Sequence, residues 1–550
     1  MNPCKTRFLN AAGAAWLLCA CTAVLCACSS TPRAAADAGK SPADVAADVP
    51  PIGDVATASD VAPDAATPAD TAAELDAKTV TLGDLHAGAH PHVGLAAVVT
   101  FTTSEPTFGS VVVATDGAAD WIAPAAEPTP VTAHTVVVRG LHADTNYDFR
   151  ARALTGGKEK LGETTVPWHT DPLPADFPVF KVNVTDKAKM QPGLTLAALV
   201  RVDPGKGGSD SSFPPTLLAF DAAGAVVWYV RPSDFDRALG VNLIDGKIAV
   251  VGYDGISVFD LDWNLVKTLT PKQLGMDVLH HDIINLPGGH MLVVSVRVLP
   301  PQLVNGTNTC DVIDEVHEIT ADGVTVQKWA MDDFVPYKAG EISGDGFYDS
   351  LAPGCSTRDI YHVNSLNWSA SDDTITVGLY MRGQVLRFKR STGAFVWTIG
   401  KGGTMPLADG NAWFMATHGP YLRANGNLIV MDNGWVQNGG LKMTPSRAVE
   451  YSFDKDPAGK DLAHEVWSWK LAQVSPLEGN VQELANGNVF VCAGFEMQVP
   501  GDFESVRPHL AEVTHEATPQ VVFDLVVEPS PGADPLPPFV VARAWRIDGL

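Results

Sequence analysis

Apolar and polar residues alternate in short runs from about residue 174 to the C-terminus, and these runs recur as one repeated unit. In each unit a strand ends on an apolar or aromatic residue, a turn containing Gly or Asp follows, and a second strand returns, often with a Trp. Alternation with a period of two, interrupted by turn residues, predicts β-hairpins. Six segments follow this pattern: LLAFDAAGAVVWYV, ISVFDLDWNLVKTL, VHEITADGVTVQKW, VLRFKRSTGAFVWTI, VEYSFDKDPAGKDLAHEVWSW and LAEVTHEATPQVVFDLV.

A second kind of hairpin, most often with an Asn-Gly or Asp-Gly turn, lies between these segments. Its instances are LIDGKIAVV, LPGGHMLVV, WSASDDTITV, LRANGNLIVM and LANGNVFVC. Two hairpins per unit make a four-stranded sheet, and six such sheets around one axis make a six-bladed β-propeller. We therefore expect an all-β protein with a propeller over residues 174–550. The last strand, PFVVARAWRID, is expected to close the ring by pairing with the first blade.

Residues 79–173 contain shorter alternating strands, among them LAAVVTFTT, GSVVVAT, HTVVVRGL and YDFRARAL. Their spacing predicts one small β-sandwich in front of the propeller. The segment LHADTNYDFRARAL resembles the corner at which a fibronectin-type-III or immunoglobulin-like sandwich enters its penultimate strand. That resemblance implies that the hydroxyl of Tyr147 bonds to nearby backbone.

The beginning of the chain has a different composition. Lys5 and Arg7 precede an apolar stretch that is too short to span a membrane, so residues 1–28 are interpreted as a lipoprotein-type signal peptide. Its end, LCAC, is similar to a bacterial lipobox, which implies a lipid on Cys28, with ordinary cleavage nearby as the alternative. Residues 29–78 are rich in Ala, Asp, Pro and Thr and predict a disordered tether. We expect an exported protein, periplasmic or at the cell surface, held to the outer membrane by its lipid alone.

The charge and the cysteines of the chain indicate which partners, disulfides and metal sites are to be expected. A net charge of −25 disfavours nucleic acid as a partner. Export permits disulfides, and Cys310 and Cys355, in loops of one repeat unit, are the favoured pair. The sequence has no C-x-x-C and no H-E-x-x-H motif, so a structural zinc site is not predicted.

Three histidines, His281, His362 and His418, each begin the inner strand that precedes a turn in three consecutive repeat units. Equivalent positions of a radial repeat converge on one axis, so the three imidazoles are expected to share a pocket. Imidazole can act there as a nucleophile, a base, an acid or a cationic clamp. Arg297 and Arg382 end the outgoing strands of two of these hairpins and could add positive charge. Such a pocket favours transfer of an anionic group, although three histidines can also hold zinc or iron.

Four segments resemble the bacterial arylsulfate sulfotransferase family, whose members use no nucleotide sulfate donor: HHDIINLPGGHMLVV, DIYHVNSLNWSASDDTITV, VLRFKRSTGAFVWTIGKGG and THGPYLRANGNLIVMDNG. The resemblance extends from about residue 176 to the C-terminus, and the sandwich suits the family's N-terminal domain. It implies a ping-pong reaction, without a cofactor, that moves a sulfuryl group from an aryl sulfate ester through a sulfohistidine to an acceptor phenol. Small aryl sulfates and phenols are the implied partners, and a homodimer is compatible with the sequence.

The matching motifs imply a role for each histidine. His418 would be the nucleophile, whereas His362 and His281 would hold the sulfate oxygens and assist proton transfer. His280 would support them from the opposite face of its strand, and Asp432, in MDNG, is expected to orient a histidine. The candidates for substrate binding are His280, Tyr380, Asn364 and Arg297.

One position departs from the family pattern. The family carries an arginine where this chain has Tyr380, and the nearest arginine is Arg382. Two residues further along a strand a side chain is on the same face, so Arg382 is expected to replace the missing cation. The alternative function is a propeller that is non-catalytic or binds a metal and recognises a surface ligand.

Overall fold

The computed structural model describes residues 80–117, 119–125, 127–203, 208–209, 213–231, 240–304, 306–338, 348–408, 410–436, 442–530 and 538–550. The predicted signal peptide, the tether and Cys28 lie outside the described residues. Within them the chain is nearly all β, with one short helix, α2 (Pro271–Leu274). The 3-10 turns are η1 (Pro287–Gly289), η2 (Met331–Asp333), η3 (Asp349–Leu351), η4 (Tyr380–Arg382) and η5 (Phe503–Ser505). In this part of the chain no helix has the length and hydropathy needed to cross a bilayer.

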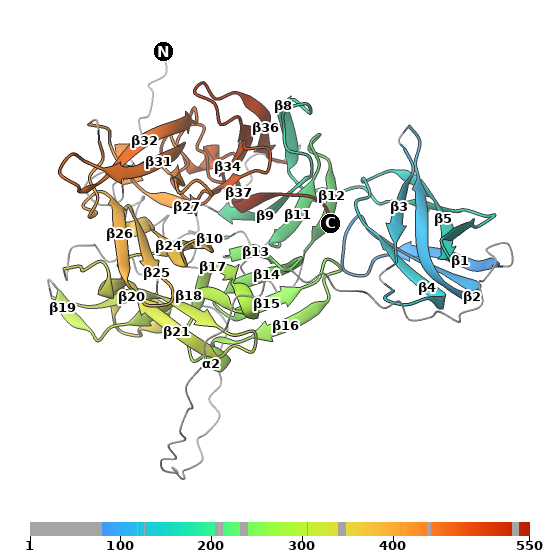
Figure 1. The fold of residues 1–550 in the computed structure, drawn as a ribbon, viewed down its shortest axis with the longest axis horizontal. Helices are drawn as coiled ribbons and strands as arrows, with labels where there is room; N and C mark the ends of the chain where they lie inside the picture. The colour runs from blue at the N-terminus through green and yellow to red at the C-terminus, as the bar shows by residue number, and fades with distance from the viewer. Residues whose placement is uncertain are drawn as a thin grey trace, which may run out of the picture.

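The N-terminal domain is built on one long strand, β2 (Ala97–Ala114), and stands beside the ring in blue in Figure 1. The first part of β2 pairs with β1 (Leu82–Ala89) and β4 (Val131–Val138), and its second part pairs with β3 (Trp121–Pro124) and β5 (Asn146–Thr155). β5 also pairs with β6 (Lys158–Leu161) and β7 (Val166–His169). The hydroxyl of Tyr147 accepts a hydrogen bond of 2.8 Å from the His142 backbone N–H, which confirms the predicted corner.

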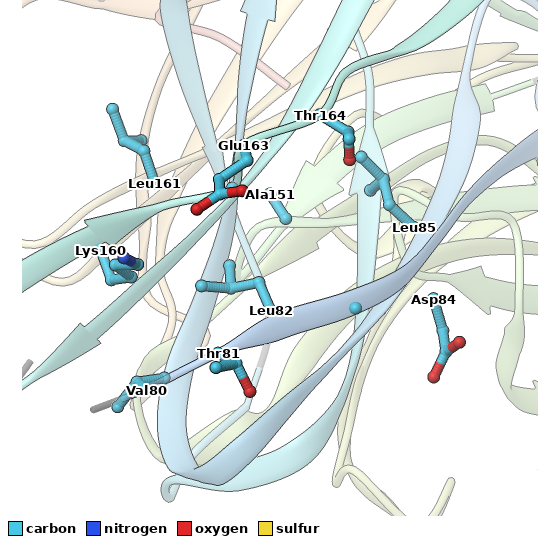
Figure 2. A pocket seen from close by; sticks show the side chains of 12 residues that line it. Val80, Thr81, Leu82, Asp84, Leu85, Ala151, Lys160, Leu161, Glu163 and Thr164 are labelled. Carbon is cyan, nitrogen blue, oxygen red and sulfur yellow. The ribbon is translucent and has the colours of Figure 1, made fainter. Parts of the chain in front are cut away.

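The N-terminal domain also holds a pocket of about 360 Å³ between β1 and the segment that leaves β6 (Figure 2). Its walls are residues 80–85 and 160–164, together with Ala151. Asp84, Lys160 and Glu163 are its charged side chains. Every lining residue belongs to the N-terminal domain, so this pocket is separate from the predicted histidine cluster.

Six sheets surround one axis and form the predicted six-bladed β-propeller (Figure 1). Blade 1 contains β37 (Phe539–Ile547), β9 (Leu194–Asp203), β11 (Thr216–Phe220), β12 (Val226–Val230) and the short β10 (Gly208–Ser209). Blade 2 contains β13 (Gly240–Ile244), β14 (Lys247–Gly252), β15 (Gly255–Phe259) and β16 (Leu265–Leu269). Blade 3 contains β17 (Leu279–Asn285), β18 (Met291–Val298), β20 (Thr307–Ile319), β21 (Thr325–Ala330), β19 (Gln302–Val304) and β22 (Ser356–Asp359).

The other three blades complete the ring. Blade 4 contains β23 (Val363–Ser369), β24 (Thr374–Leu379), β25 (Gln384–Lys389) and β26 (Phe395–Gly400). Blade 5 contains β27 (Thr417–Leu422), β28 (Leu428–Asp432), β31 (Arg447–Lys455) and β32 (Asp461–Lys470), with the small pair β29 (Trp435–Val436) and β30 (Lys442–Met443) beside it. Blade 6 contains β33 (Asn480–Glu483), β34 (Val489–Ala493), β35 (His509–Val513), β36 (Val521–Glu528) and β8 (Val179–Thr185).

Two strands from opposite ends of the propeller sequence close the ring. The last strand, β37, pairs antiparallel with β9 and becomes the innermost strand of blade 1, as predicted. In addition, β8 pairs antiparallel with the outer strand β36 of blade 6, which the repeat pattern did not predict. Because β37 is an inner strand, its side chains can reach the axis, and this position brings an arginine into the site described below.

Tryptophans of the repeat pack between blades. Trp228, Trp329, Trp397 and Trp467 are all buried, and the Trp228 indole N–H donates to the Leu261 carbonyl of the next blade at 3.2 Å. The Trp228 ring thus fills the gap between two sheets and still satisfies its one donor. The repeated Trp therefore fixes the spacing of the blades around the axis.

Cys310 on β20 and Cys355 just before β22 form a disulfide, with their Cα atoms 5.8 Å apart. The bond joins two strands that run parallel, with Cys310 opposite Thr357. β22 ends at Asp359, a residue of the candidate site, so the disulfide holds a strand that supports that site. Cys492 on β34 is free and buried.

Candidate functional site

The three predicted histidines lie in or directly before the innermost strands β17, β23 and β27, and they meet in one cluster. The rings of His281 and His362 lie edge to face with centroids 4.6 Å apart. Tyr380 lies between His362 and His418, and its ring centroid is 5.6 Å from that of His362 and 5.1 Å from that of His418. The histidines keep exposed fractions of 8%, 7% and 5% in chain order, so each is buried without being sealed from solvent.

An irregular backbone at the start of each inner strand aims these side chains. The pairing register shifts at His280/Ile283 in β17, at Val363/Ser365 in β23 and at His418/Tyr421 in β27. His281 and His362 adopt the left-handed conformation, with φ of 58° and 52°. Such bulges and left-handed residues redirect side chains and carry a local energetic cost, and they concentrate at functional sites.

Blade 5 reaches the same result with a glycine. Gly419, directly after His418, takes the left-handed conformation with φ of 54°. A Cβ at this position would come within 2.9 Å of the Asn480 backbone of blade 6, so a larger residue would push the two inner strands apart. The HG pair therefore lets His418 approach the axis while blades 5 and 6 stay packed.

The hydrogen bonds of Asn433 define the tautomer of His418. The Asn433 amide nitrogen donates to the carbonyls of Ser475 and Glu478, at 2.9 and 3.1 Å, which leaves its Oδ1 as an acceptor. Oδ1 lies 2.8 Å from Nδ1 of His418, so this nitrogen carries the proton and Nε2 keeps its lone pair. Burial lowers the pKa of His418 to about 3, opposed by the Asn433 hydrogen bond and reinforced by the charges of His362 and Arg543. His418 is thus a neutral imidazole at pH 7.

Asp432 does not orient a histidine, contrary to the sequence-based expectation. Its carboxylate accepts hydrogen bonds from the backbone N–H groups of Met415 and Gly434, at 3.1 and 3.0 Å, and from Arg447 at 3.0 Å. Strand alternation explains the difference, because adjacent residues point to opposite sides. Asn433, one residue later, is the one that faces His418.

His362 is held by a carboxylate instead of an amide. Asp359 Oδ2 lies 2.6 Å from its Nδ1, and Oδ1 accepts its backbone N–H at 3.0 Å. A carboxylate beside an imidazole favours the protonated ring and fixes its orientation. His362 is therefore suited to present a charged N–H to an anion.

His281 is the end of a buried chain of polar groups. Its Nδ1 lies 2.7 Å from Nδ1 of His280, and the His280 Nε2 lies 3.2 Å from the Asp314 carboxylate. The pKa of His281 is well below its usual value because of burial, with further contributions from the charges of His362, His280 and His418. Burial also raises the pKa of Asp314. His280 therefore contacts His281 directly and does not point to the opposite face of the strand as predicted, because the left-handed backbone at His281 interrupts the alternation of side chains.

Arg543 is a further cation in the same cluster, and it was not among the residues predicted from the sequence. Arg543 lies on the closing strand β37, where its Nη1 pairs with Asp282 at 2.8 Å and its Nη2 donates to the Asn364 carbonyl. Its charge contributes to the lowered pKa values of His281 and His418. The signal was present in the predicted closing strand, because an inner strand of a propeller must direct alternate residues towards the axis.

A carboxylic acid, Glu478, was also missed. It lies two residues before β33 in blade 6 and directly before Gly479, the residue that occupies the histidine position of that blade. Burial raises the pKa of Glu478 to about 7, although the charges of Arg543 and His362 lower it. At neutral pH this carboxyl is divided between its neutral and charged forms.

Arg382 does not share a face with Tyr380, contrary to our expectation. Residues 380–382 form the 3-10 turn η4 and do not continue the strand. With three residues per turn, side chains two positions apart point in directions that differ by about 120°. The Tyr380 ring enters the cluster and its hydroxyl donates to the Pro476 carbonyl at 2.8 Å, whereas the charge of Arg382 lies near Tyr361.

The two remaining substrate-binding candidates differ in position. The Asn364 side chain donates to the Thr417 carbonyl at 2.8 Å and so links blades 4 and 5 beside the cluster. Arg297 pairs with Asp332 at 2.7 Å and with Glu315 at 3.1 Å, in a separate group of charges. Among the described residues, no group of three or more His, Cys, Asp or Glu side chains has the arrangement of a metal site.

Residues 180–532 match the arylsulfotransferase (ASST) family. No curated protein matches the chain. Similar solved structures include a protein of unknown function from Bacteroides caccae (10% identity over 64% of this chain and 98% of that chain, TM-score 0.34). A second is the periplasmic gluconolactonase PpgL of Pseudomonas aeruginosa (15% identity over 79% of this chain and 99% of that chain, TM-score 0.31). A third is the hydrazine synthase of Kuenenia stuttgartiensis (8% identity over 52% of this chain and 66% of that chain, TM-score 0.31).

Proposed function

Because the chain belongs to the arylsulfotransferase (ASST) family and is therefore an aryl-sulfate sulfotransferase, we propose that His418 carries the sulfuryl group between donor and acceptor. The observation that supports this role best is the hydrogen bond from His418 Nδ1 to Asn433 Oδ1, at 2.8 Å. It leaves the Nε2 lone pair free on a ring that is neutral at pH 7, which is the form a nucleophile requires.

The reaction then has two half-reactions. In the first, Nε2 of His418 attacks the sulfur of the aryl sulfate, the bond from sulfur to the aryl oxygen breaks, and a phenol leaves. In the second, the oxygen of an acceptor phenol attacks the same sulfur and the nitrogen–sulfur bond breaks. One site serves both halves, because donor and acceptor present the same chemical group to it.

Charged groups around His418 suit the transferring sulfuryl oxygens. His362, with its carboxylate partner, and Arg543, from the closing strand, provide N–H donors and positive charge in a buried site, where such groups stabilise developing charge most effectively. We propose Arg543 as the guanidinium that takes the place of the arginine absent at Tyr380. The Tyr380 ring, with its hydroxyl engaged by Pro476, offers a flat apolar surface to an aryl group.

The test of this proposal is transfer from 4-nitrophenyl sulfate to phenol by the purified full chain, followed by mass spectrometry of the protein without acceptor. We expect release of nitrophenol, formation of phenyl sulfate and one sulfuryl group on the peptide that contains His418. A protein that transfers nothing but carries stoichiometric zinc or iron would instead support a non-catalytic, metal-binding propeller.

We also propose export and lipid attachment at Cys28, on the strength of the LCAC sequence at the end of the leader. Membrane fractionation and labelling with a radioactive fatty acid test this, with Cys28→Ser as the control that should lose the label and leave the membrane. A label retained by Cys28→Ser would contradict the proposal. A homodimer stays a prediction, for which light scattering of the purified protein is the measurement.

A further inference from the structure

Blade 6 has a carboxylate one residue before the position at which blades 3 and 4 have a histidine. Glu478 lies two residues before the inner strand β33 and adopts the left-handed conformation, with φ of 57°. His281 and His362 have φ of 58° and 52° at the start of their own inner strands. Few residues other than glycine adopt this conformation. The chain therefore makes the same left-handed turn at Glu478 as at the two histidines, and the charges of Arg543 and His362 both act on the Glu478 carboxyl.

The backbone of Glu478 is tied to the residue that orients the nucleophile. The Asn433 amide donates to the Glu478 carbonyl at 3.1 Å, while its oxygen accepts from His418. One side chain thereby holds both the imidazole of blade 5 and the backbone of Glu478 in blade 6. Their separation cannot change without loss of these hydrogen bonds.

The carboxyl of Glu478 has no hydrogen bond or ion pair with any of the described residues. The residue is partly exposed, but the protein around its carboxyl still removes much of the water that would solvate a charge there. The charged and titratable groups that face it come from three directions: Arg543 of β37, His362 of blade 4 and the Cys492 thiol of the neighbouring strand β34. An acid held in place and left without a partner is available to a bound molecule.

We propose that Glu478 is a further catalytic residue, which gives a proton to the aryl oxygen of the donor and takes one from the hydroxyl of the acceptor. This inference rests on the proposed function of His418. His281 and His418 are poor sources of that proton, because their pKa values lie well below neutrality. The pKa of Glu478, about 7, suits exchange in both directions.

The proton balance closes over the two half-reactions. When the bond from nitrogen to sulfur forms, the electron pair of the breaking sulfur–oxygen bond stays on the aryl oxygen, which takes the Glu478 proton. When the acceptor attacks, its hydroxyl proton moves to the Glu478 carboxylate, and the electron pair of the nitrogen–sulfur bond returns to His418. Glu478 ends as it began, in the acid form.

The experiment compares two donors in Glu478→Gln. The nitrophenolate released from 4-nitrophenyl sulfate is a weak base and needs little protonation, whereas the leaving oxygen of phenyl sulfate is far more basic. We expect the first turnover with 4-nitrophenyl sulfate to fall by less than about fivefold and that with phenyl sulfate by about a hundredfold. Glu504→Gln, an exposed carboxylate near blade 6, is the matched control and should change neither rate.

The pH dependence gives a second readout. In the wild type, kcat/KM for phenyl sulfate should fall as pH rises through about 7, because Glu478 loses the proton that it must donate. In Glu478→Gln this decline should disappear. Glu478→Asp, which keeps the acid on a shorter side chain, should retain a decline and provides the comparison if the glutamine variant does not fold.

Each outcome separates the two proposals. If the wild type transfers sulfuryl groups but Glu478→Gln slows both donors by the same factor, Glu478 only maintains the structure and the inference is wrong, whereas the role of His418 stands. If Glu478→Gln slows neither donor, the inference is wrong as well. If the wild type transfers from no donor at all, the proposed function fails and the inference fails with it.

Discussion

Blades 4 and 5 each place a histidine near the axis, but they give it different partners. His362 has the Asp359 carboxylate 2.6 Å from its Nδ1, and His418 has the Asn433 amide oxygen 2.8 Å from the same atom. A carboxylate stabilises the imidazolium ion, whereas an uncharged amide does so weakly. The same repeat position thereby holds one ring whose carboxylate partner favours the positive charge that can hold an anion, and one neutral ring that can attack sulfur.

The largest effect should come from removing the two histidines in turn. His418→Ala should lower the transfer rate by about 10⁴-fold or more and leave no sulfuryl group on the protein, because the covalent step has no nucleophile. His362→Ala should lower the rate by about a hundredfold but still form the covalent intermediate, because only the clamp is lost. Intact-protein mass spectrometry after mixing with donor alone is the measurement. Sulfation of the His418→Ala protein would contradict the division of roles.

Giving blade 5 the partner of blade 4 should have the next largest effect. In Asn433→Asp a carboxylate would raise the pKa of His418 from about 3 towards neutrality, and a protonated ring has no lone pair on Nε2. We expect about a hundredfold loss of activity at pH 6 that is partly recovered at pH 8. The pH profile of kcat/KM is the measurement, with circular dichroism to verify folding. A loss that is the same at both pH values would indicate misplacement of the ring instead.

The reciprocal change in blade 4 should have a smaller effect. Asp359→Asn keeps an acceptor for His362 but removes the charge that favours its protonated form, so we expect about a tenfold loss. The loss should appear mainly in KM for the anionic donor, because the clamp binds the sulfate. Steady-state kinetics with 4-nitrophenyl sulfate measure it. A change confined to kcat would mean that His362 acts in proton transfer rather than in binding.

The fold was predictable because each blade repeats the same local signals. Each hairpin carries its own signals in the sequence: alternating strands, turn residues and often a Trp. Their repetition predicts six sheets without any knowledge of contacts between distant residues. The pairing of β37 with blade 1 followed from the same count. The pairing of β8 with β36 could not be predicted in this way. An added outer strand needs only a free sheet edge, so it does not change the repeated sequence pattern.

The site was predictable only where the repeat itself carries it. His281, His362 and His418 begin inner strands, so their meeting followed from the geometry of the ring. Arg543 and Glu478 lie outside the histidine pattern. Arg543 is on the closing strand, and Glu478 is in blade 6, where glycine occupies the histidine position. Only the assembled ring places them beside the histidines.

The error at Arg382 has a local cause. A strand was assumed where the chain turns after β24, and the turn η4 changes the direction of every side chain that follows Tyr380. A spacing of two residues places side chains on the same face only while the backbone is extended. In the turn the same spacing no longer does so. Arg543, more than a hundred residues away, is the arginine that reaches the histidines.

The smallest effect concerns stability, and it tests whether His418 is neutral in the folded protein. Its pKa is about 3 when folded and near 6.5 when unfolded, so between these pH values the unfolded chain binds one proton more at this residue. Stability should therefore be lost as pH falls through this window, by about 1.4 kcal/mol per pH unit from His418 alone. His418→Gln should remove this part of the loss, whereas His464→Gln, on the outer strand β32 of the same blade, should not. Urea midpoints of the propeller at pH 4.5 and pH 6 measure it, and equal acid sensitivity in wild type and His418→Gln would mean that the folded imidazole is already protonated, which would make blades 4 and 5 alike.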